Sequence, residues 1–321
     1  MKVLFTADIH IKLGQKNVPV DWAKNRYNLL WQQFETAQTN ADIFIIGGDV
    51  FDKLPSMDEI EIYFDLISHC KIPTIIYSGN HDAVKKSTTF MSNLAKVTNL
   101  MSSKRNVIVI DDYYSDYGIE FVPYNKLKDF EQSNPWPEGG RILCTHVRGQ
   151  IPPHVIPEIN LDIFNNWDIV LAGDLHSYEN CQRNILYPGS PITTSFHRDI
   201  VETGIIILDT ETLKHSWIKL DLPQLIRKTV GPNDPKLPTN YHHTIYQVEG
   251  DLQELGGLED SDLIDKKIIK RNIEDVQLML DNNMSLVEEV KEYLQYILEL
   301  PKDTIDKAIL EVQNNLDKIE E

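Results

Sequence analysis

Cysteine is scarce in this sequence of 321 residues, and long apolar runs are absent. Cys70, Cys144 and Cys181 are widely spaced, so we expect neither a zinc-type cysteine pair nor a disulfide framework. No stretch approaches the ~18 consecutive apolar residues of a membrane span, and the chain starts directly in a strand-like run rather than in a signal segment. These absences predict a cytoplasmic protein with reduced thiols.

Basic residues are also few: 31 Lys and Arg stand against 49 Asp and Glu, which makes the formal net charge −18. This balance excludes a protein that holds nucleic acid by its overall field. Bound cations or a basic partner can still create a local site for a phosphodiester. Charge alone therefore leaves the substrate open.

Strand-like apolar runs alternate with amphipathic helical stretches through about residue 220. Residues 22–38 and 56–70 carry apolar side chains at helical spacing, and Asp21 is the expected N-cap of the first helix. Shorter runs after residue 106 predict a second sheet packed on the first. We predict an α/β fold over residues 1–222, a two-sheet sandwich flanked by helices.

A change in composition follows residue 222. Residues 222–241 are rich in proline, which disfavours regular structure and marks a boundary. Beyond it we expect a small α+β capping domain over residues 223–283 and a helical hairpin over residues 284–321. Apolar side chains recur there at coiled-coil spacing at Ile305, Ile309, Val312 and Leu316. They either bind another protein's helices or pack within this chain.

Side chains that bind metals stand at the ends of five of the strand-like runs. In chain order they are Asp8 and His10, Asp49, Asn80 with His81 beside it, His146, and Asp174 with His176. Asp8 and His10 occupy alternate positions, so both face one side if extended geometry persists. Each cluster alone has ordinary structural explanations. The ordered series, however, predicts a two-metal hydrolytic site for phosphate esters.

The ordered series resembles the calcineurin-like metallophosphoesterase superfamily, whose pattern is Asp-x-His, Gly-Asp, Gly-Asn-His, a lone His, and Gly-His-x-His. Within it, residues 187–191 (Tyr-Pro-Gly-Ser-Pro) and 48–52 resemble the SbcD-type DNA repair exonucleases, also called the meiotic-recombination-eleven family. The motifs cover residues 8–191. The later segments agree in order with that family's capping domain and ATPase-binding helices.

The resemblance implies two metal ions that share Asp49. Asp8, His10 and His176 would complete one ligand set, and Asn80, His146 and position 174 the other; His81 would be the general acid, with Asp82 beside it. Position 174 departs from the family, since it is Asp where the family has His. An added carboxylate should favour manganese or magnesium over zinc. If Asp174 points away, the second site is weaker.

The same resemblance implies a manganese-dependent DNA nuclease, acting on duplex ends and within single strands, that works with an SbcC-type ATPase in recombination and repair. It further implies a homodimer built from the helices at 56–70 and 88–100, although burial within the monomer explains their apolar stripes equally well. A phosphodiesterase or phosphatase acting on a small molecule or a protein is the alternative. DNA contacts are not readable: Lys12, Lys85 and Lys86 either reach phosphates or are simply solvated.

Overall fold

The computed structural model describes residues 1–85, 88–101, 107–259, 261–268 and 284–320. Two compact units account for the chain: residues 1–249 with 257–267, and residues 250–256 with 268–321. Among the described residues no helix is both long and apolar enough to cross a membrane. All three cysteines are free thiols, as expected.

The first sheet contains six strands in the order β13-β12-β1-β2-β3-β6. Their bounds are β1 Lys2–Thr6, β2 Ile43–Gly47, β3 Thr74–Tyr77, β6 Val107–Ile110, β12 Gly204–Asp209 and β13 His215–Lys219. Strands β1, β2, β3 and β6 run parallel, whereas β12 is antiparallel to β1. The prediction that the later short strands form the second sheet was wrong for β6, β12 and β13, which extend the first sheet on its two sides.

The second sheet has the order β11-β10-β9-β8-β7. Its strands are β7 Tyr114–Asp116, β8 Ile119–Val122, β9 Gly140–His146, β10 Trp167–Gly173 and β11 Ile185–Leu186. One face packs on the first sheet, where Phe5 and Tyr77 lie in the same buried cluster as Phe121 and Leu171. Alternate residues of a strand point to opposite faces, so Leu4 and Phe44 turn the other way, toward the helices. The predicted sandwich is confirmed.

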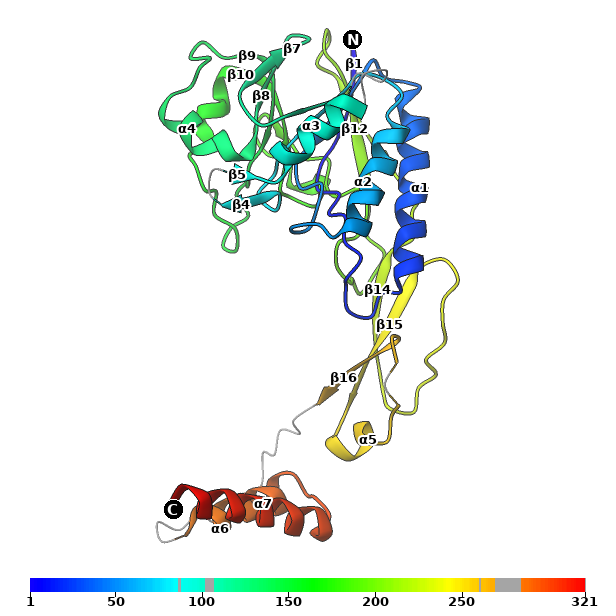
Figure 1. The fold of residues 1–321 in the computed structure, drawn as a ribbon, viewed down its shortest axis with the longest axis vertical. Coiled ribbons are helices and arrows are strands. Elements are labelled where there is room, and N and C mark those ends of the chain that lie inside the picture. The colour runs from blue at the N-terminus through cyan, green and yellow to red at the C-terminus, as the bar shows by residue number, and fades with distance from the viewer. Residues whose placement is uncertain (86–87, 102–106, 260, 269–283, 321) are drawn as a thin grey trace. The chain divides into compact units, whose positions relative to one another are not determined.

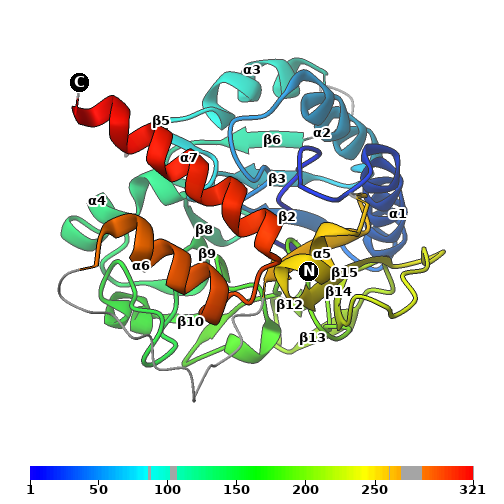
Figure 2. The same cartoon turned by 90° about the horizontal axis from the view of Figure 1, so that it is seen from below.

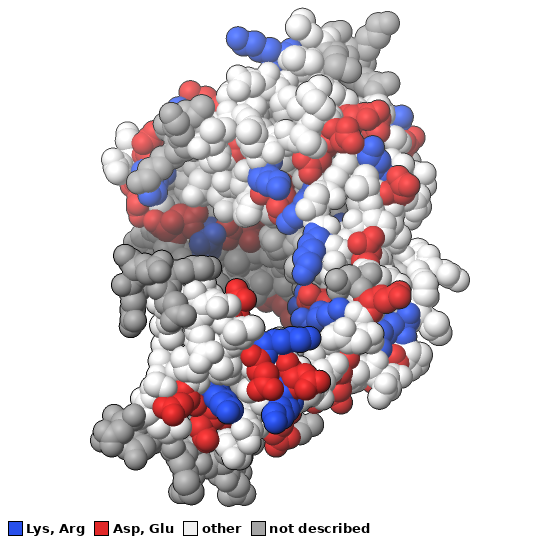
Figure 3. Space-filling view, turned by 60° about the horizontal axis from the view of Figure 1, so that its bottom comes forward, with Lys and Arg blue, Asp and Glu red and all other residues white. Residues whose placement is uncertain are grey.

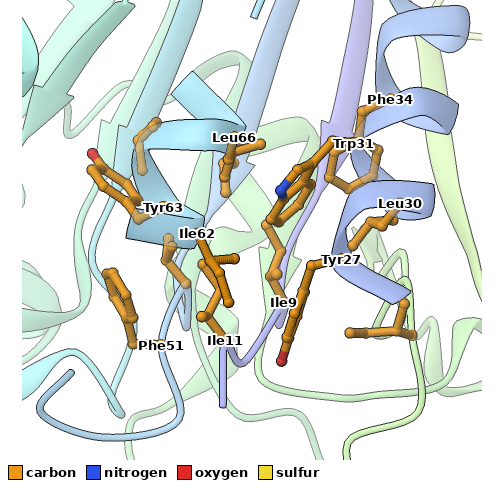
Figure 4. Packing of buried hydrophobic residues seen from close by; sticks show 14 of the residues in the cluster. Ile9, Ile11, Tyr27, Leu30, Trp31, Phe34, Phe51, Ile62, Tyr63 and Leu66 are labelled. Atoms are coloured by element: carbon orange, nitrogen blue, oxygen red, sulfur yellow. The ribbon is translucent and has the colours of Figure 1, made fainter. Parts of the chain in front are cut away.

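Two helices, α1 (Val20–Gln38) and α2 (Met57–His69), run side by side (Figure 1). Figure 4 shows Leu30, Trp31 and Phe34 of α1 in the buried cluster that also contains Ile62 and Leu66 of α2. Ser56 caps α2 through a reciprocal capping box with Glu59. The Asp21 prediction was wrong: Pro19 occupies the N-cap position, and Asp21 lies in the first turn, where the helix dipole favours a carboxylate.

Shorter elements complete the first unit. They are β4 (Ala83–Lys85), β5 (Thr88–Thr89), α3 (Met91–Met101), α4 (Leu127–Gln132), 3₁₀ turns at Tyr124–Lys126, Leu161–Asn166 and Tyr178–Asn180, and a sheet of β14 (Leu225–Val230), β15 (His243–Gly250) and β16 (Ile264–Ile268). Most of that sheet clusters with the first unit. The capping-domain boundaries stay predictions, and residues 260 and 269–283 of that domain lie outside the described residues.

The second unit contains α5 (Leu252–Gly256), α6 (Leu286–Glu292), a π-helical turn (Tyr293–Ile297) and α7 (Lys302–Glu320). Helices α6 and α7 lie alongside each other in both ribbon views (Figures 1 and 2). Ser285 caps α6 through a capping box with Glu288, and α7 begins just after Pro301. The predicted C-terminal helical hairpin is confirmed.

Candidate metal centre

The predicted ligands lie where parallel strands of the two sheets end. Asp8 and His10 follow β1, Asp49 follows β2, Asn80 and His81 follow β3, His146 ends β9, and Asp174 and His176 follow β10. The sheets are joined beneath them, because Tyr77 donates from its hydroxyl to the Thr145 carbonyl at 3.0 Å and His146 Nδ1 lies 2.9 Å from the Gly47 carbonyl oxygen. One edge of the sandwich therefore collects side chains from five strand ends.

Four of these residues adopt left-handed backbone. The φ angles are 57° at Asp8, 49° at His10, 48° at Asp49 and 102° at Asp174. The condition of extended geometry from Asp8 to His10 is therefore not met: β1 ends at Thr6, and the chain turns at both residues. Such backbone costs about 1–3 kcal/mol at a non-glycine residue. Hydrogen bonds hold it here, from the Asp8 amide to Gly48 at 3.1 Å and from the His10 amide to Asp49 at 2.9 Å.

Two glycines allow the backbone to pass close to the side chains of the site. Gly48 has a φ of 88°, and a Cβ there would lie 2.5 Å from His146 Nδ1. A Cβ at Gly79 would collide with the Asp49 carboxylate. Any larger residue at either position would displace a predicted ligand, so glycine is required at both.

Asp8, His10 and His176 form one group, called here the His10 group, whose ligand atoms all lie within 4.8 Å of one another. The Nε2 atoms of His10 and His176 are 3.1 Å apart, and His176 Nε2 lies 3.9 Å from Asp8 Oδ1. Asp8 is fully buried and accepts the Asp174 amide at 3.0 Å. Converging imidazole and carboxylate donors of this kind fit a divalent cation.

Asp8, Asp49 and His146 form a second group within the same limit, called here the His146 group. His146 Nε2 lies 3.5 Å from Asp49 Oδ2 and 2.9 Å from Asn80 Oδ1. Because Nδ1 of His146 donates to the Gly47 carbonyl, its Nε2 is the atom left to face a cation. Asp49 Oδ2 is also 3.6 Å from His10 Nε2, so the Asp49 carboxylate reaches the His10 group as well. This is the position that a ligand bridging two cations would need.

The remaining predicted ligand, Asp174, is paired with a guanidinium. Its Oδ2 lies 3.1 Å from Nε of Arg148 and its Oδ1 lies 3.2 Å from Nη2. This two-point pair matches carboxylate geometry and holds the Asp174 side chain against Arg148. Sequence reasoning missed Arg148; its only signal was a cation two residues after His146.

His81 and Asp82 lie beside the two groups. The His81 amide donates to Asp49 Oδ1 at 2.8 Å, and its Nδ1 lies 2.7 Å from the Asp52 carbonyl oxygen, so Nε2 is the atom available for proton transfer. The His81 ring stands edge-on to His10 with centroids 4.8 Å apart. Asp82 is fully buried and accepts the amides of Gly79 at 2.9 Å and Phe51 at 3.2 Å, so it joins the turn that carries His81 to the turn that carries Asp49.

Burial and crowded carboxylates perturb the protonation of the site. Burial lowers the pKa of His10 to about 3 and also lowers that of His176. Burial disfavours the charged form of His146 too, but Asp49, Asp8 and Asp174 outweigh it and hold its pKa well above the usual value. Burial and the charge of Asp49 together raise the pKa of Asp8 far above its normal range. A divalent cation stabilises the ionised form of carboxylates that are buried close together in this way.

A family model described as calcineurin-like phosphoesterase matches residues 1–190, which is more than half of the chain. The chain belongs to the calcineurin-like phosphoesterase family. It is therefore an enzyme that hydrolyses phosphate esters, and its family works with divalent metal ions. The fold and the gathered donor groups agree with that membership.

Two viral relatives resemble this calcineurin-like phosphoesterase in sequence. The "Probable exonuclease subunit 1" of Escherichia phage T5 is 40% identical over 319 residues, which cover 96% of this chain and 97% of the relative. The "Putative phosphoesterase 244L" of Invertebrate iridescent virus 6 is 25% identical over 226 residues, 64% of this chain and 75% of the relative. A solved structure described as a novel archaeal phosphodiesterase is 14% identical, with a TM-score of 0.38 over 68% of this chain and all of that one.

Residues 187–191 of the phosphoesterase anchor the loops that carry the predicted ligands. The Ser190 hydroxyl donates to the Asp8 carbonyl at 2.7 Å, and the Tyr187 hydroxyl donates to the Val147 carbonyl at 3.1 Å. Gly189 has a φ of 77° and lies against the His176 backbone. The motif therefore holds in place the loops that carry the predicted ligands.

The three lysines considered for DNA contact remain without a demonstrated role. The Lys12 ammonium pairs with Asp52 at 2.9 Å, beside the His81 turn. Lys86 and the side chain of Lys85 lie outside the described residues.

Proposed function

We propose that this phosphoesterase is a manganese-dependent DNA nuclease that cleaves phosphodiester bonds with two bound cations. The observation that carries the proposal is the pairing of the His10 and His146 groups around one carboxylate, Asp49, in a chain that is similar along 96% of its length to a probable phage exonuclease subunit. The predicted activities are exonuclease action on duplex ends and endonuclease action on single strands.

Asp8, His10, Asp49 and His176 would hold one cation, and Asp49, Asn80, His146 and Asp174 the other. Two such ions supply Lewis-acid activation of water and of the phosphate oxygens. The protein supplies the proton: His81, oriented by the Asp52 carbonyl, presents Nε2 for transfer to the departing sugar oxygen. Asp82 keeps the turn that carries His81 in place.

Arg148 gives position 174 a second possible role. While Asp174 pairs with Arg148, the carboxylate is neutralised by a guanidinium instead of by a cation. Binding of a second ion through Asp174 would release Arg148, which could then contact a phosphate of the substrate. Hard oxygen donors at this position favour manganese or magnesium.

DNA as the substrate is tested by comparing two esters. End-labelled duplex DNA and a small chromogenic diester are incubated with the full-length protein and manganese. We expect digestion of the duplex from its ends, and we expect a chelator to abolish this digestion. Hydrolysis of the small diester alone would instead favour a small-molecule phosphodiesterase or phosphatase. That outcome is a genuine alternative because acidic side chains are interspersed with basic ones on the face shown in Figure 3.

We further propose that α6 and α7 bind an SbcC-type ATPase. Ile305 is buried, whereas Ile309, Val312 and Leu316 are half-buried. Other apolar side chains of the pair stay exposed, including Leu310 at 58% and Tyr296 at 46%. Burial of Ile305 accounts for packing within the helical pair, whereas exposed side chains such as Leu310 and Tyr296 leave apolar surface for a partner.

Co-purification tests that partner. Deleting residues 303–321 should abolish recovery of the ATPase and leave metal-dependent cleavage by the isolated subunit intact. Leu310→Glu should weaken recovery, while Gln313→Glu, at an exposed position of the same helix, serves as a control for added charge. Equal recovery of the ATPase by all three variants would contradict the assignment.

A homodimer formed through α2 and α3 is the third part of the proposal. Both helices bury one face within the monomer, and the Tyr63 and Thr98 hydroxyls lie 2.9 Å apart between them. Outer apolar side chains remain exposed, with Met57 at 77% and Leu100 at 78%. Leu100→Glu should shift the protein from dimer to monomer in sedimentation, and an unchanged mass would contradict this interface.

A further inference from the structure

A cavity of about 810 Å³ adjoins the metal centre on the side of His176. Its walls come from the turn after β10, from residues 190–203 and from Trp217 of β13. All of these residues belong to the first unit. None of them except His176 has been assigned a role in metal binding or proton transfer.

The cavity and the metal centre share one imidazole as a wall. Nε2 of His176 faces His10 at 3.1 Å, within the His10 group. Nδ1 of the same ring lies 3.3 Å from the Thr194 hydroxyl, which lines the cavity. Only the His176 ring thus separates a ligand in the cavity from a phosphate at the metal centre. The sugar of a nucleotide can span that distance.

The lining argues against a phosphate as the occupant. The carboxylate of Glu179 lines the cavity, as does that of Glu202, which is paired with Lys219 at 2.8 Å; no Lys or Arg lines it among the described residues. A phosphate chain would be repelled there. A neutral group that donates hydrogen bonds would be attracted, because carboxylates only accept them.

Two further features suit a planar, hydrogen-bonding ligand. Tyr178 and Trp217 both line the cavity and stack on each other, with centroids 5.4 Å apart and an angle of 25° between the rings. Trp217 is fixed by donating from Nε1 to the Pro188 carbonyl at 2.9 Å. Thr203, which is only 4% exposed, has a buried hydroxyl oxygen without a hydrogen-bond partner among the described residues. Buried polar atoms of this kind are rare unless a ligand or water satisfies them.

We propose that this cavity binds an unpaired nucleoside, base and sugar together, of the nucleotide whose phosphate lies at the metal centre. The volume falls within the range of ligand pockets, about 300–1,000 Å³. Aromatic rings accept any base by stacking, and the carboxylates favour bases with an exocyclic amino group. Cytosine and adenine therefore bind more tightly than thymine. This inference rests on the proposed nuclease function.

The test measures nucleoside binding without metal. Deoxycytidine, deoxyadenosine and thymidine are titrated calorimetrically into the full-length protein in chelator. Thr203→Val keeps the side chain's shape and removes its hydroxyl, and Glu179→Gln removes a charge; each should weaken deoxycytidine binding about threefold to tenfold. The controls are Thr229→Val and Glu211→Gln, which alter the same residue types outside the cavity.

A second arm separates this inference from the nuclease proposal. With manganese, the two cavity variants should raise KM for single-stranded DNA and leave hydrolysis of the small chromogenic diester unchanged. DNA cleavage that continues while no nucleoside binds, or nucleoside affinities that the cavity variants do not alter, would overturn the cavity assignment. Failure of the wild-type protein to cleave DNA would overturn the nuclease proposal instead, and with it the nucleotide context of the cavity.

Discussion

The two halves of the candidate metal centre are the His10 group and the His146 group. They differ in which protein groups balance their carboxylates when no cation is bound. In the His10 group, burial lowers the pKa of both His10 and His176, so the imidazoles are neutral and ready to act as ligands. In the His146 group the imidazole holds a proton, and Asp174 is already paired with Arg148. The His10 group therefore has no positively charged side chain, whereas the His146 group has the protonated imidazole of His146 and the guanidinium of Arg148.

This difference predicts that the two ions bind with unequal ease. A cation entering the His10 group meets neutral imidazoles. A cation entering the His146 group displaces a proton from the imidazole and also competes with Arg148 for Asp174, and this competition costs free energy that the first ion does not spend. Asp8 would bind the first ion, which therefore has to displace the proton that the raised pKa of Asp8 retains, so the pairing of Asp174 with Arg148 makes the difference between the two ions.

The largest predicted effect removes the residue that the halves share. Asp49→Asn should abolish binding of both ions and lower cleavage by about a thousandfold or more, because both proposed ligand sets include the Asp49 carboxylate. Asparagine tolerates the left-handed backbone found at this position, so the fold should survive. Manganese titration by electron paramagnetic resonance, with circular dichroism as the folding control, checks it; an unchanged stoichiometry would contradict the bridging role.

Next in size is a variant that should affect chemistry but neither half of the centre. His81→Ala should lower cleavage by about 10²–10⁴, the usual contribution of a general acid, while both manganese ions remain bound. Stopped-flow cleavage and metal stoichiometry are measured on the same preparation. Undiminished cleavage, or loss of an ion, would assign His81 a different role.

Acidity should then weaken both halves, through a different group in each. Below the raised pKa values of Asp8 and His146, each unit fall in pH should weaken each ion about tenfold, because Asp8 must lose a proton to bind the first ion and His146 must lose one to bind the second. Near neutral pH the imidazoles of His10 and His176 have no proton to lose, since their pKa values are lowered. Calorimetric titration at pH 6, 7 and 8 tests this, and binding of either ion that does not change with pH would refute the assignment of its titrating ligand.

The smallest predicted effect concerns Arg148. Arg148→Met frees the Asp174 carboxylate and should tighten the second ion by up to about fivefold, the range expected when a partly exposed ion pair no longer competes. Arg183→Met, which removes an exposed guanidinium paired with Asp162, is the matched control. Weaker binding of the second ion in Arg148→Met would show that the guanidinium supports the site.

The sequence was sufficient for the fold and for the gathering of the site, but not for its local geometry. Ligands at strand ends predicted convergence because parallel strands share an edge, and five such ends meet as expected. The turn at Asp8 and His10 was not predictable, since it depends on hydrogen bonds to Gly48 and Asp49, which are remote in sequence. Arg148 was missed for a similar reason: its pairing with Asp174 joins the ends of two different strands.

The left-handed backbone at the ligand positions also restricts which substitutions are informative. Because asparagine and glycine occupy that conformation more readily than other residues, Asp8→Asn alters the ligand with little strain, whereas a β-branched replacement would damage the turn itself. In a mutational scan of this edge, many variants would therefore be inactive because their loops misfold, not because a ligand is lost. Amide replacements are the ones that separate chemistry from architecture, and a trapped complex with substrate is best sought with them.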